Sequence, residues 1–241
     1  MLELSKLPTN RLESNIINSI VIIGGTGTGK STVGNILSQR TGYKLYEIGH
    51  VVKSLYLRRM EDEIGLLLGS PLKVFEYVQD RFRRNSKDIF TNLRLDYARD
   101  MVRDNSVDYF VKKLLELYFY ENIIIIGARS VQEIKTIRSR IKFPFFVGLT
   151  CGESKLVRRF ITRERDFMLP DKAGEIFEKR RWTENTWGVE EVLDECDIVI
   201  STDNIMPSDL ATTILDEYKK YVAEKSFLKN KTIYDNKKII H

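Results

Sequence analysis

The sequence has few of the side chains that hold transition metals. Its 241 residues include two cysteines, Cys151 and Cys196, and two histidines, His50 and His241. These four residues show none of the spacings that are typical of zinc sites, so we expect no zinc centre. The low cysteine content also favours a reducing compartment over a disulfide-stabilised secreted fold.

Long apolar runs are absent too. No stretch approaches the roughly 18–20 apolar residues that span a bilayer, and residues 1–15 lack the apolar centre and cleavage site of a secretory signal. We therefore expect a soluble, cytoplasmic protein with no membrane partner. The excess of positive charge is small, since 39 Lys and Arg face 34 Asp and Glu for a net charge of +5. Such a balance suits small anionic ligands and does not predict nucleic-acid binding.

The chain alternates short apolar runs with amphipathic segments, a pattern typical of an α/β fold with a parallel sheet between helices. Its hydrophobic content of 42% is enough for the core of one domain. The predicted strands are Ile20–Ile23, Lys44–Glu47, Asn122–Ile126, Phe145–Leu149 and Asp197–Ile200. Helical spacing predicts three apolar faces, formed by Val33, Ile36 and Leu37, by Leu156, Val157, Phe160 and Ile161, and by Leu210, Ile214, Leu215 and Tyr218.

A glycine-rich turn follows the first predicted strand in the stretch "SIVIIGGTGTGKSTVGNIL", residues 19–37. Gly24, Gly29, Lys30 and Ser31 match the phosphate-loop pattern G-x-x-x-x-G-K-[ST]. Glycines let consecutive backbone N–H groups approach the phosphates, and the N-terminus of the next helix adds positive potential. We expect Lys30 to reach the β- and γ-phosphates of ATP and Ser31 to bind Mg²⁺. The predicted ATP-binding residues are Gly24, Gly25, Thr26, Gly27, Thr28, Gly29, Lys30, Ser31 and Thr32.

Three further stretches, "RTGYKLYEIGHVVKSLY", "IIIIGARSVQEIKTIRS" and "RRFITRERD…RRWTENTWG…CDIVISTDN", extend the pattern. With them the chain resembles the phosphate-loop nucleoside monophosphate kinases and the related dephospho-CoA kinases, over residues 20–60 and 122–215. The resemblance implies a three-layer α/β/α fold with a five-stranded parallel sheet. It also implies phosphoryl transfer from ATP, with Mg²⁺, to a small phosphate-bearing acceptor.

The same resemblance implies roles for particular residues. Glu47 stands at the acidic position near Mg²⁺ and the acceptor phosphate, and Lys53 stands where an Arg holds that phosphate. Arg129 matches the Arg of a Gly-x-Arg turn, and Arg163 and Arg165 match arginines of a lid that closes over the transferred group. The implied catalytic residues are therefore Lys30, Glu47, Arg129, Arg163 and Arg165, the acceptor-binding residues Lys53 and Arg129, and the metal-binding residues Ser31 and Glu47.

Two residues depart from the family's pattern. Ile126 stands at a strand end where many phosphate-loop enzymes carry an Asp, and His50 stands where adenylate kinase-like members often have Asp. Either metal binding has moved to Glu47 or catalysis has been lost. We predict that His50 is a hydrogen-bonded turn residue.

About seventy residues separate the second and third predicted strands, far more than one crossover helix needs. We predict one domain with a core at about 18–50 and 121–222, a helical acceptor-binding insertion at about 51–120, a lid at about 158–187 and an extension at 223–241. The tail, from Lys225, lacks periodicity and should be a loose or docked extension. Within the insertion, a few charged residues are further candidates for the acceptor or the metal: Arg84, Arg94, Arg99 and Arg103, and Asp80, Asp96 and Asp100.

The residue types alone also favour phosphoryl transfer, which depends on positioning and on cations around the transferred group. Arginine binds phosphate through a planar fork, and the segment 157–181 offers Arg158, Arg159, Arg163, Arg165, Arg180 and Arg181. The alternative is that these arginines lie on a solvated helix and pair with acidic neighbours. The stretch "DFMLPDKAG" is predicted as a loop, and Trp182 and Trp187 as packing residues.

Arg129 precedes Ser130 and Glu133, a capping-box pattern that should start a helix at the carboxyl end of the sheet, where open α/β folds bind ligands. Alternatively, Arg129 forms a surface salt bridge, and Glu47 is an exposed carboxylate at the start of a turn.

Two other functions of the protein remain open. A regulatory GTPase would need an Asn-Lys-x-Asp stretch, which "STDN" and "YDNKK" do not supply. A nucleotide-binding module without turnover is consistent with the missing acid at Ile126.

Overall fold

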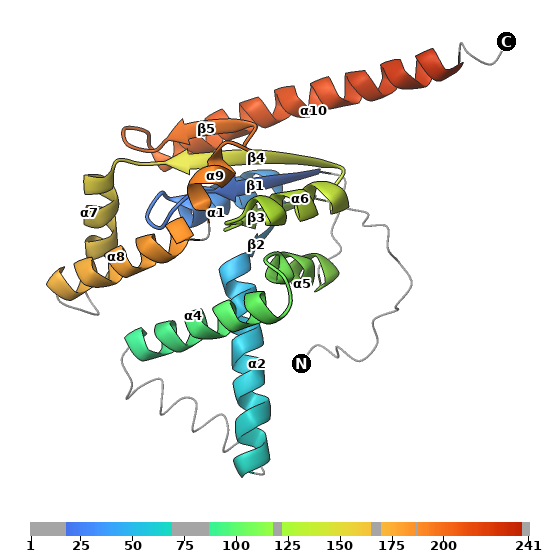
Figure 1. The fold of residues 1–241 in the computed structure, drawn as a ribbon. Helices are drawn as coiled ribbons and strands as arrows, with labels where there is room; N and C mark the ends of the chain where they lie inside the picture. Colours follow the sequence, from blue (N-terminus) through green and yellow to red (C-terminus); the bar gives the residue numbers. More distant parts are fainter. Residues whose placement is uncertain (1–17, 69–86, 118–121, 165–169, 187, 238–241) are drawn as a thin grey trace.

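The computed structural model describes residues 18–68, 87–117, 122–164, 170–186 and 188–237. Its five strands are β1 (Asn18–Ile23), β2 (Lys44–Glu47), β3 (Asn122–Ile126), β4 (Phe143–Thr150) and β5 (Ile198–Ser201). They form one all-parallel sheet in the order β2-β3-β1-β4-β5 (Figure 1). All five predicted strands are confirmed, and with them the three-layer α/β/α fold. Because β1 is central, the loop that follows it lies in the middle of the carboxyl edge of the sheet.

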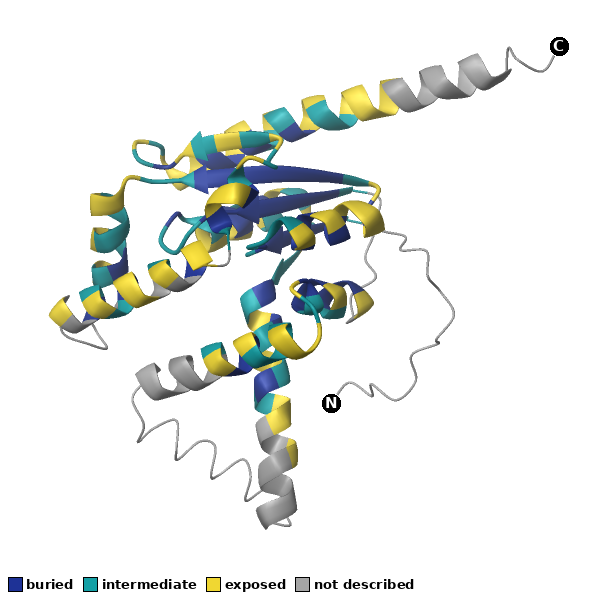
Figure 2. Cartoon of the chain, viewed as in Figure 1, coloured by how far each residue is buried: buried dark blue, intermediate teal, exposed yellow. Residues whose placement is uncertain are grey.

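Each face of the sheet is covered by helices, because the central strands are apolar on both sides (Figure 2). Ile20 and Ile22 face α1 (Lys30–Thr41) and α10 (Pro207–Lys237), in a core that includes Leu37 and Ile214. The alternate residues of β1 face the opposite side, which is covered by α6 (Val131–Arg140) and the short helix α9 (Val189–Leu193). The central strands are therefore held on both faces, which fixes the position of the loop after β1.

Three described helices lie between β2 and β3, where the sequence predicts several: α2 (Ile48–Leu68), α4 (Lys87–Asp104) and α5 (Tyr109–Leu117). They lie together on one side of the sheet (Figure 1). Tyr56 of α2, Tyr97 of α4 and Phe110 of α5 are buried, and their rings stack with centroids 5.4 Å and 6.5 Å apart. These aromatic contacts join the three helices into one packed unit.

Two helices at the other end of the carboxyl edge have a small core of their own. They are α7 (Glu153–Glu164) and α8 (Pro170–Thr186), and Phe160, Ala173 and Phe177 are buried between them. The predicted loop at residues 166–174 is wrong for its second half, because Pro170 begins α8; proline is well suited to the first position of a helix. Trp182 is not a packing residue, since it is 68% exposed on α8, and Trp187 lies outside the described residues.

The tail, expected as a loose or docked extension, is helical through Lys237, because it continues α10 from Pro207. It extends past the sheet in Figure 1. Leu210, Ala211, Ile214 and Tyr218 anchor its first half on the sheet. Among the described residues, no helix combines the length and the apolarity that crossing a membrane requires.

Candidate functional site

The phosphate loop runs from Gly24 to Gly29 between β1 and α1. Gly24 has φ +146°, and a side chain there would collide with the backbone carbonyl of Leu149 on β4. Gly29 has φ +91° and precedes the first residue of α1. Both positions require glycine, because the first has no room for a Cβ and both have positive φ. The N-terminus of α1 thus points into the loop, as anion binding requires.

The Gly25 carbonyl oxygen is the centre of the loop's internal hydrogen bonds. It accepts bonds from the Thr28 N–H at 3.3 Å, from the Thr28 hydroxyl at 2.9 Å and from the Lys30 ammonium at 2.6 Å. Lys30, the first residue of α1, therefore curls back over the loop to which its helix is attached. Its ammonium lies inside the loop, where the predicted phosphates would bind.

A cavity of about 560 Å³ opens over this loop. The structure brings together there most of the residues that the sequence selected: Thr26, Gly27, Thr28, Gly29, Lys30, Ser31, Thr32, Glu47 and Arg129. They come from the loop, from the end of β2 and from the turn after β3. Residues at or after the ends of three neighbouring parallel strands therefore line one cavity.

Other predicted site residues lie elsewhere. Gly24 and Gly25 form the base of the loop. Lys53 is exposed on α2 and is not among the described residues that line the cavities. Arg163 belongs to α7, but its side chain, like Arg165 as a whole, lies outside the described residues. In the insertion, Asp96, Arg99, Asp100 and Arg103 form surface ion pairs on α4, while Asp80, Arg84 and the side chain of Arg94 lie outside the described part.

Glu47 lies beside the position of the missing acid, at the end of the neighbouring strand. It is the last residue of β2, and in the sheet register it pairs with Ile126, the last residue of β3. The Glu47 carboxylate lies 3.6 Å from Nε2 of His50, which is exposed in the first turn of α2. The prediction that His50 is a turn residue is wrong, because His50 lies in α2, where it contacts the candidate metal ligand. The carboxylate lines the cavity, one strand away from the usual place.

The donors at this site suit Mg²⁺ when nucleotide is bound. Magnesium prefers oxygen ligands and is usually held by one or two carboxylates together with substrate phosphates and water. Ser31 offers a hydroxyl and Glu47 a carboxylate to the same cavity. The described residues include no cluster of three or more His, Cys, Asp or Glu that could hold a metal. Ser31 and Glu47 are the residues that would hold Mg²⁺, whose charge would then lie against the phosphates.

Two residues of the cavity were not assigned a specific role from the sequence. Arg159 of α7 donates to the carbonyls of Gly27 and Thr202, at 3.3 Å and 2.8 Å, and to the Thr202 hydroxyl at 3.0 Å. Glu184 of α8 accepts two hydrogen bonds from Thr26. Arg159 belonged to a recognisable arginine cluster. Glu184 had no comparable signal, because its partner is 158 residues away in the chain.

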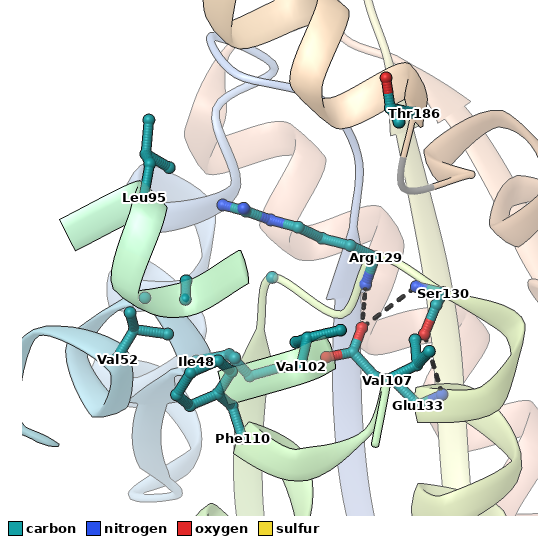
Figure 3. A pocket seen from close by; sticks show the side chains of 13 residues that line it. Ile48, Val52, Leu95, Val102, Val107, Phe110, Arg129, Ser130, Glu133 and Thr186 are labelled. Carbon is teal, nitrogen blue, oxygen red and sulfur yellow. Dashed lines mark hydrogen bonds between the residues drawn. The ribbon is translucent and has the colours of Figure 1, made fainter. Parts of the chain in front are cut away.

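A second cavity of about 290 Å³ lies between the sheet and helices α2, α4 and α5 (Figure 3). Its described walls are mainly apolar and include Ile48, Val52, Leu95, Ala98, Val102, Val107 and Phe110. Arg129, Ser130, Glu133 and Thr186 supply the polar side chains. Arg129 and Gly49 line both cavities, so the two spaces adjoin at these residues.

Arg129 is held by the capping box that the sequence predicts. The Ser130 hydroxyl accepts from the Glu133 N–H, and the Glu133 carboxylate accepts from the Arg129 and Ser130 N–H groups at 2.6 Å and 3.1 Å (Figure 3). Glu133 is 6% exposed, and this burial raises its pKa to about 7, against the opposing effect of the Arg129 and Ser130 N–H groups. The carboxyl that holds the Arg129 backbone therefore gains its proton near neutral pH.

This raised pKa predicts a pH-dependent stability. Because the folded state holds the Glu133 proton more tightly than the unfolded chain, the stabilisation is complete below pH ~4.5 and is lost as pH rises through ~7. The loss should approach roughly 3 kcal/mol, at about 1.4 kcal/mol per pKa unit. Denaturant unfolding of the wild type and of Glu133→Gln between pH ~4.5 and ~7 measures this loss of stability. Glu190→Gln, at an exposed position, is the control. Parallel curves for wild type and Glu133→Gln would contradict the assignment.

Several known proteins resemble this chain over most of its length. A cytidylate kinase from Sulfurisphaera tokodaii is 25% identical over 213 residues, which cover 86% of this chain and 98% of that protein. A gluconokinase from Sinorhizobium meliloti covers 88% of this chain and 97% of its own, with 17% identity and a TM-score of 0.44. A shikimate kinase from Acinetobacter baumannii in complex with shikimate covers 86% and 95%, with 17% identity and a TM-score of 0.46. Structural similarities this weak have no bearing on the acceptor.

The family model named AAA domain matches residues 20–183, from β1 into α8. This range contains the phosphate loop, Glu47, the helices between β2 and β3, Arg129 and Arg159. The match and the cytidylate kinase relative confirm the resemblance to phosphate-loop nucleotide kinases. Because the match spans residues 20–183, most of its length, this chain belongs to the AAA domain family.

Proposed function

We propose that this protein transfers the γ-phosphoryl group of ATP to a nucleoside monophosphate or a nucleotide-like acceptor. The main support for the proposal is the position of Arg129, which lines both the phosphate-loop cavity and the apolar cavity beside it. A kinase needs two adjoining sites that share a cation at the point of transfer, because negative charge develops there on the transferred group.

The phosphate-loop cavity is the proposed ATP site. The triphosphate would lie on the loop and the N-terminus of α1, with Lys30 at the β- and γ-phosphates. Ile205, before α10, and Pro207 and Leu210, in its first turn, add an apolar surface suited to the base. Arg159 is held against the connection from β5 to α10 by its bonds to Thr202. A guanidinium fixed in this way can pack against an aromatic base.

The apolar cavity is the proposed acceptor site. A guanidinium at its mouth suits a phosphate, and its aliphatic and aromatic walls suit the flat face of a base. A polyhydroxylated acceptor would leave hydroxyl groups unpaired against these walls, at a cost of about 1–3 kcal/mol each. The cytidylate kinase among the relatives supports a nucleotide acceptor. We further propose that Arg163 and Arg165 of the predicted lid complete the cations around the transferred group.

A panel of acceptors tests this function. The protein is incubated with ATP, Mg²⁺ and single nucleoside monophosphates, dephospho-CoA, shikimate or gluconate, and the release of ADP is measured. We expect release that depends on one nucleotide-type acceptor. Tight ATP binding without acceptor-dependent release would instead favour a nucleotide-binding module, which the apolar Ile126 at the end of β3 leaves open. Release stimulated by a polyol alone would overturn the assignment of the apolar cavity.

Arg129→Lys tests the placement of the acceptor phosphate. The change keeps the charge but loses the planar fork that binds two phosphate oxygens. We expect the KM for the acceptor to rise roughly tenfold or more, about the weight of one charge-assisted hydrogen bond, while the KM for ATP changes little. Steady-state kinetics with each substrate varied in turn measures both constants. Arg99→Lys, on the exposed face of α4, is the control; equal increases in both KM values would argue against this role for Arg129.

A further inference from the structure

Glu184 makes the most specific contact between α8 and the phosphate loop. Its carboxylate accepts the Thr26 backbone N–H at 2.8 Å and the Thr26 hydroxyl at 2.6 Å. The side chain is nearly buried, since the residue is 9% exposed, and it lines the same cavity as Lys30, Ser31 and Arg129. A buried carboxylate that accepts two donors from one loop residue holds that residue in a defined orientation.

The Thr26 N–H belongs to the same peptide group as the Gly25 carbonyl. In a planar trans peptide the N–H and C=O bonds point in opposite directions. On one side of this peptide, the carbonyl oxygen accepts the Lys30 ammonium and the Thr28 hydroxyl. On the other side, the N–H group donates to Glu184. A rotation of the peptide that broke the bond to Glu184 would also turn the carbonyl away from Lys30.

The charge of Glu184 excludes a simple role in attracting phosphate. A carboxylate beside the phosphate loop repels a triphosphate, because like charges in a partly buried site are weakly screened. Its benefit must come from orientation, which is the property that its two bonds to Thr26 provide. This separates it from Glu47, whose predicted partner is Mg²⁺.

We propose that Glu184 is a positioning residue that acts through the Gly25–Thr26 peptide on Lys30. By fixing this peptide, it holds the carbonyl that anchors the Lys30 ammonium inside the loop, and so places the ammonium where the terminal phosphates of ATP bind. The inference rests on the proposed function, because it concerns the same nucleotide site. It adds that α8, at the far end of the family match, controls the geometry of the phosphate loop.

Nucleotide binding tests the proposal without any need for turnover. Calorimetry gives the affinities for ATP and ADP in the absence of acceptor, and the ratio of the two reports the contact with the γ-phosphate. Glu184→Gln retains the size of the side chain but loses the charge and one acceptor. If Glu184 positions Lys30, the ratio of ATP to ADP affinity should fall roughly tenfold, toward the value of Lys30→Ala. A tenfold change corresponds to the free energy of about one charge-assisted hydrogen bond. If Glu184 only repels phosphate, the ratio should rise. An unchanged or higher ratio would overturn the proposal.

A double variant that combines Lys30→Ala with Glu184→Gln provides a second test. In the Lys30→Ala background there is no ammonium to position, so Glu184→Gln should leave the ratio unchanged or raise it. The same fall in both backgrounds would mean that Glu184 acts independently of Lys30, against the proposal. Glu178→Gln, exposed on the same helix, is the matched control. Thr26→Val removes one of the two bonds without altering Glu184, and it should lower the ratio less than Glu184→Gln.

Turnover separates this proposal from the proposed function. If an acceptor is found, Glu184→Gln should reduce kcat roughly tenfold to hundredfold, because a small misplacement of a catalytic group has effects of this size. The KM for the acceptor should change little. If no acceptor supports turnover, the proposed function fails, and the ratio of ATP and ADP affinities still decides the role of Glu184. Thermal melting of each variant shows whether the fold is retained, and Thr26→Val serves where Glu184→Gln unfolds.

Discussion

Lys30→Ala should lower ATP turnover by at least roughly a hundredfold to a thousandfold, the weight of one preorganised group that stabilises transition-state charge. The ammonium lies 2.6 Å from the Gly25 carbonyl oxygen, inside the loop. Its charge is therefore in place before nucleotide arrives, and no solvent reorganisation is needed at the moment of transfer. Alanine leaves the β- and γ-phosphates without this cation.

The fold should survive the same change. Gly25 keeps its bonds from the Thr28 N–H and hydroxyl, so the loss of the Lys30 bond should cost only about 1.5–3 kcal/mol. Turnover is followed as ADP release and stability as the melting temperature. Lys220→Ala removes an exposed lysine of α10 that pairs with Glu217, and it should affect neither. Wild-type turnover in folded Lys30→Ala would refute the role of the loop.

Glu47→Gln should produce the second largest effect, because it removes the carboxylate that pairs in register with Ile126. Glutamine preserves the size and a hydrogen-bonding oxygen but not the charge that binds Mg²⁺ or its water molecules. We expect the variant to bind ATP, to need a much higher Mg²⁺ concentration and to lose most of its phosphoryl transfer. Turnover measured as a function of Mg²⁺ concentration gives both quantities.

Glu116→Gln is the matched control, since this exposed residue of α5 pairs with Lys113 on the surface. A surface pair of this kind contributes little to stability. Near-normal activity and an unchanged Mg²⁺ requirement in Glu47→Gln would mean that another carboxylate binds the metal. The next candidates are Asp96 and Asp100 in the described part of the chain, and Asp80 outside it.

The sequence predicted the sheet well because its strands are buried on both faces. A run such as Ile123–Ile126 has no polar alternate residue, and such runs, flanked by amphipathic segments, are typical of parallel strands under two layers of helices. The phosphate loop was equally clear, since its glycines are required by local backbone conformation. Ser130 and Glu133 likewise form a local capping box, so their contacts follow from a spacing of three residues.

The sequence did not reveal the structure of two segments, because their residue pattern disagrees with how they pack in the fold. Trp182 looked like a packing residue, but the face of α8 that packs on α7 is formed by Ala173 and Phe177, and Trp182 is outside that contact. The tail looked irregular because its apolar residues are sparse. It nevertheless continues α10, whose first half is anchored on the sheet through Ile214 and Tyr218. An anchored helix needs no new nucleus to extend further.

By itself, the sequence determined the strands, the phosphate loop and the cap that holds Arg129, because each depends on neighbours within a few residues. Tertiary structure alone decided that Glu47 pairs with Ile126, that Arg129 lies between two cavities, and that Glu184 binds Thr26. These contacts depend on strand order and helix packing, which bring together residues far apart in the chain. No local pattern encodes which carboxylate will meet a given backbone N–H across such a distance, and the candidate site consists largely of contacts of this kind.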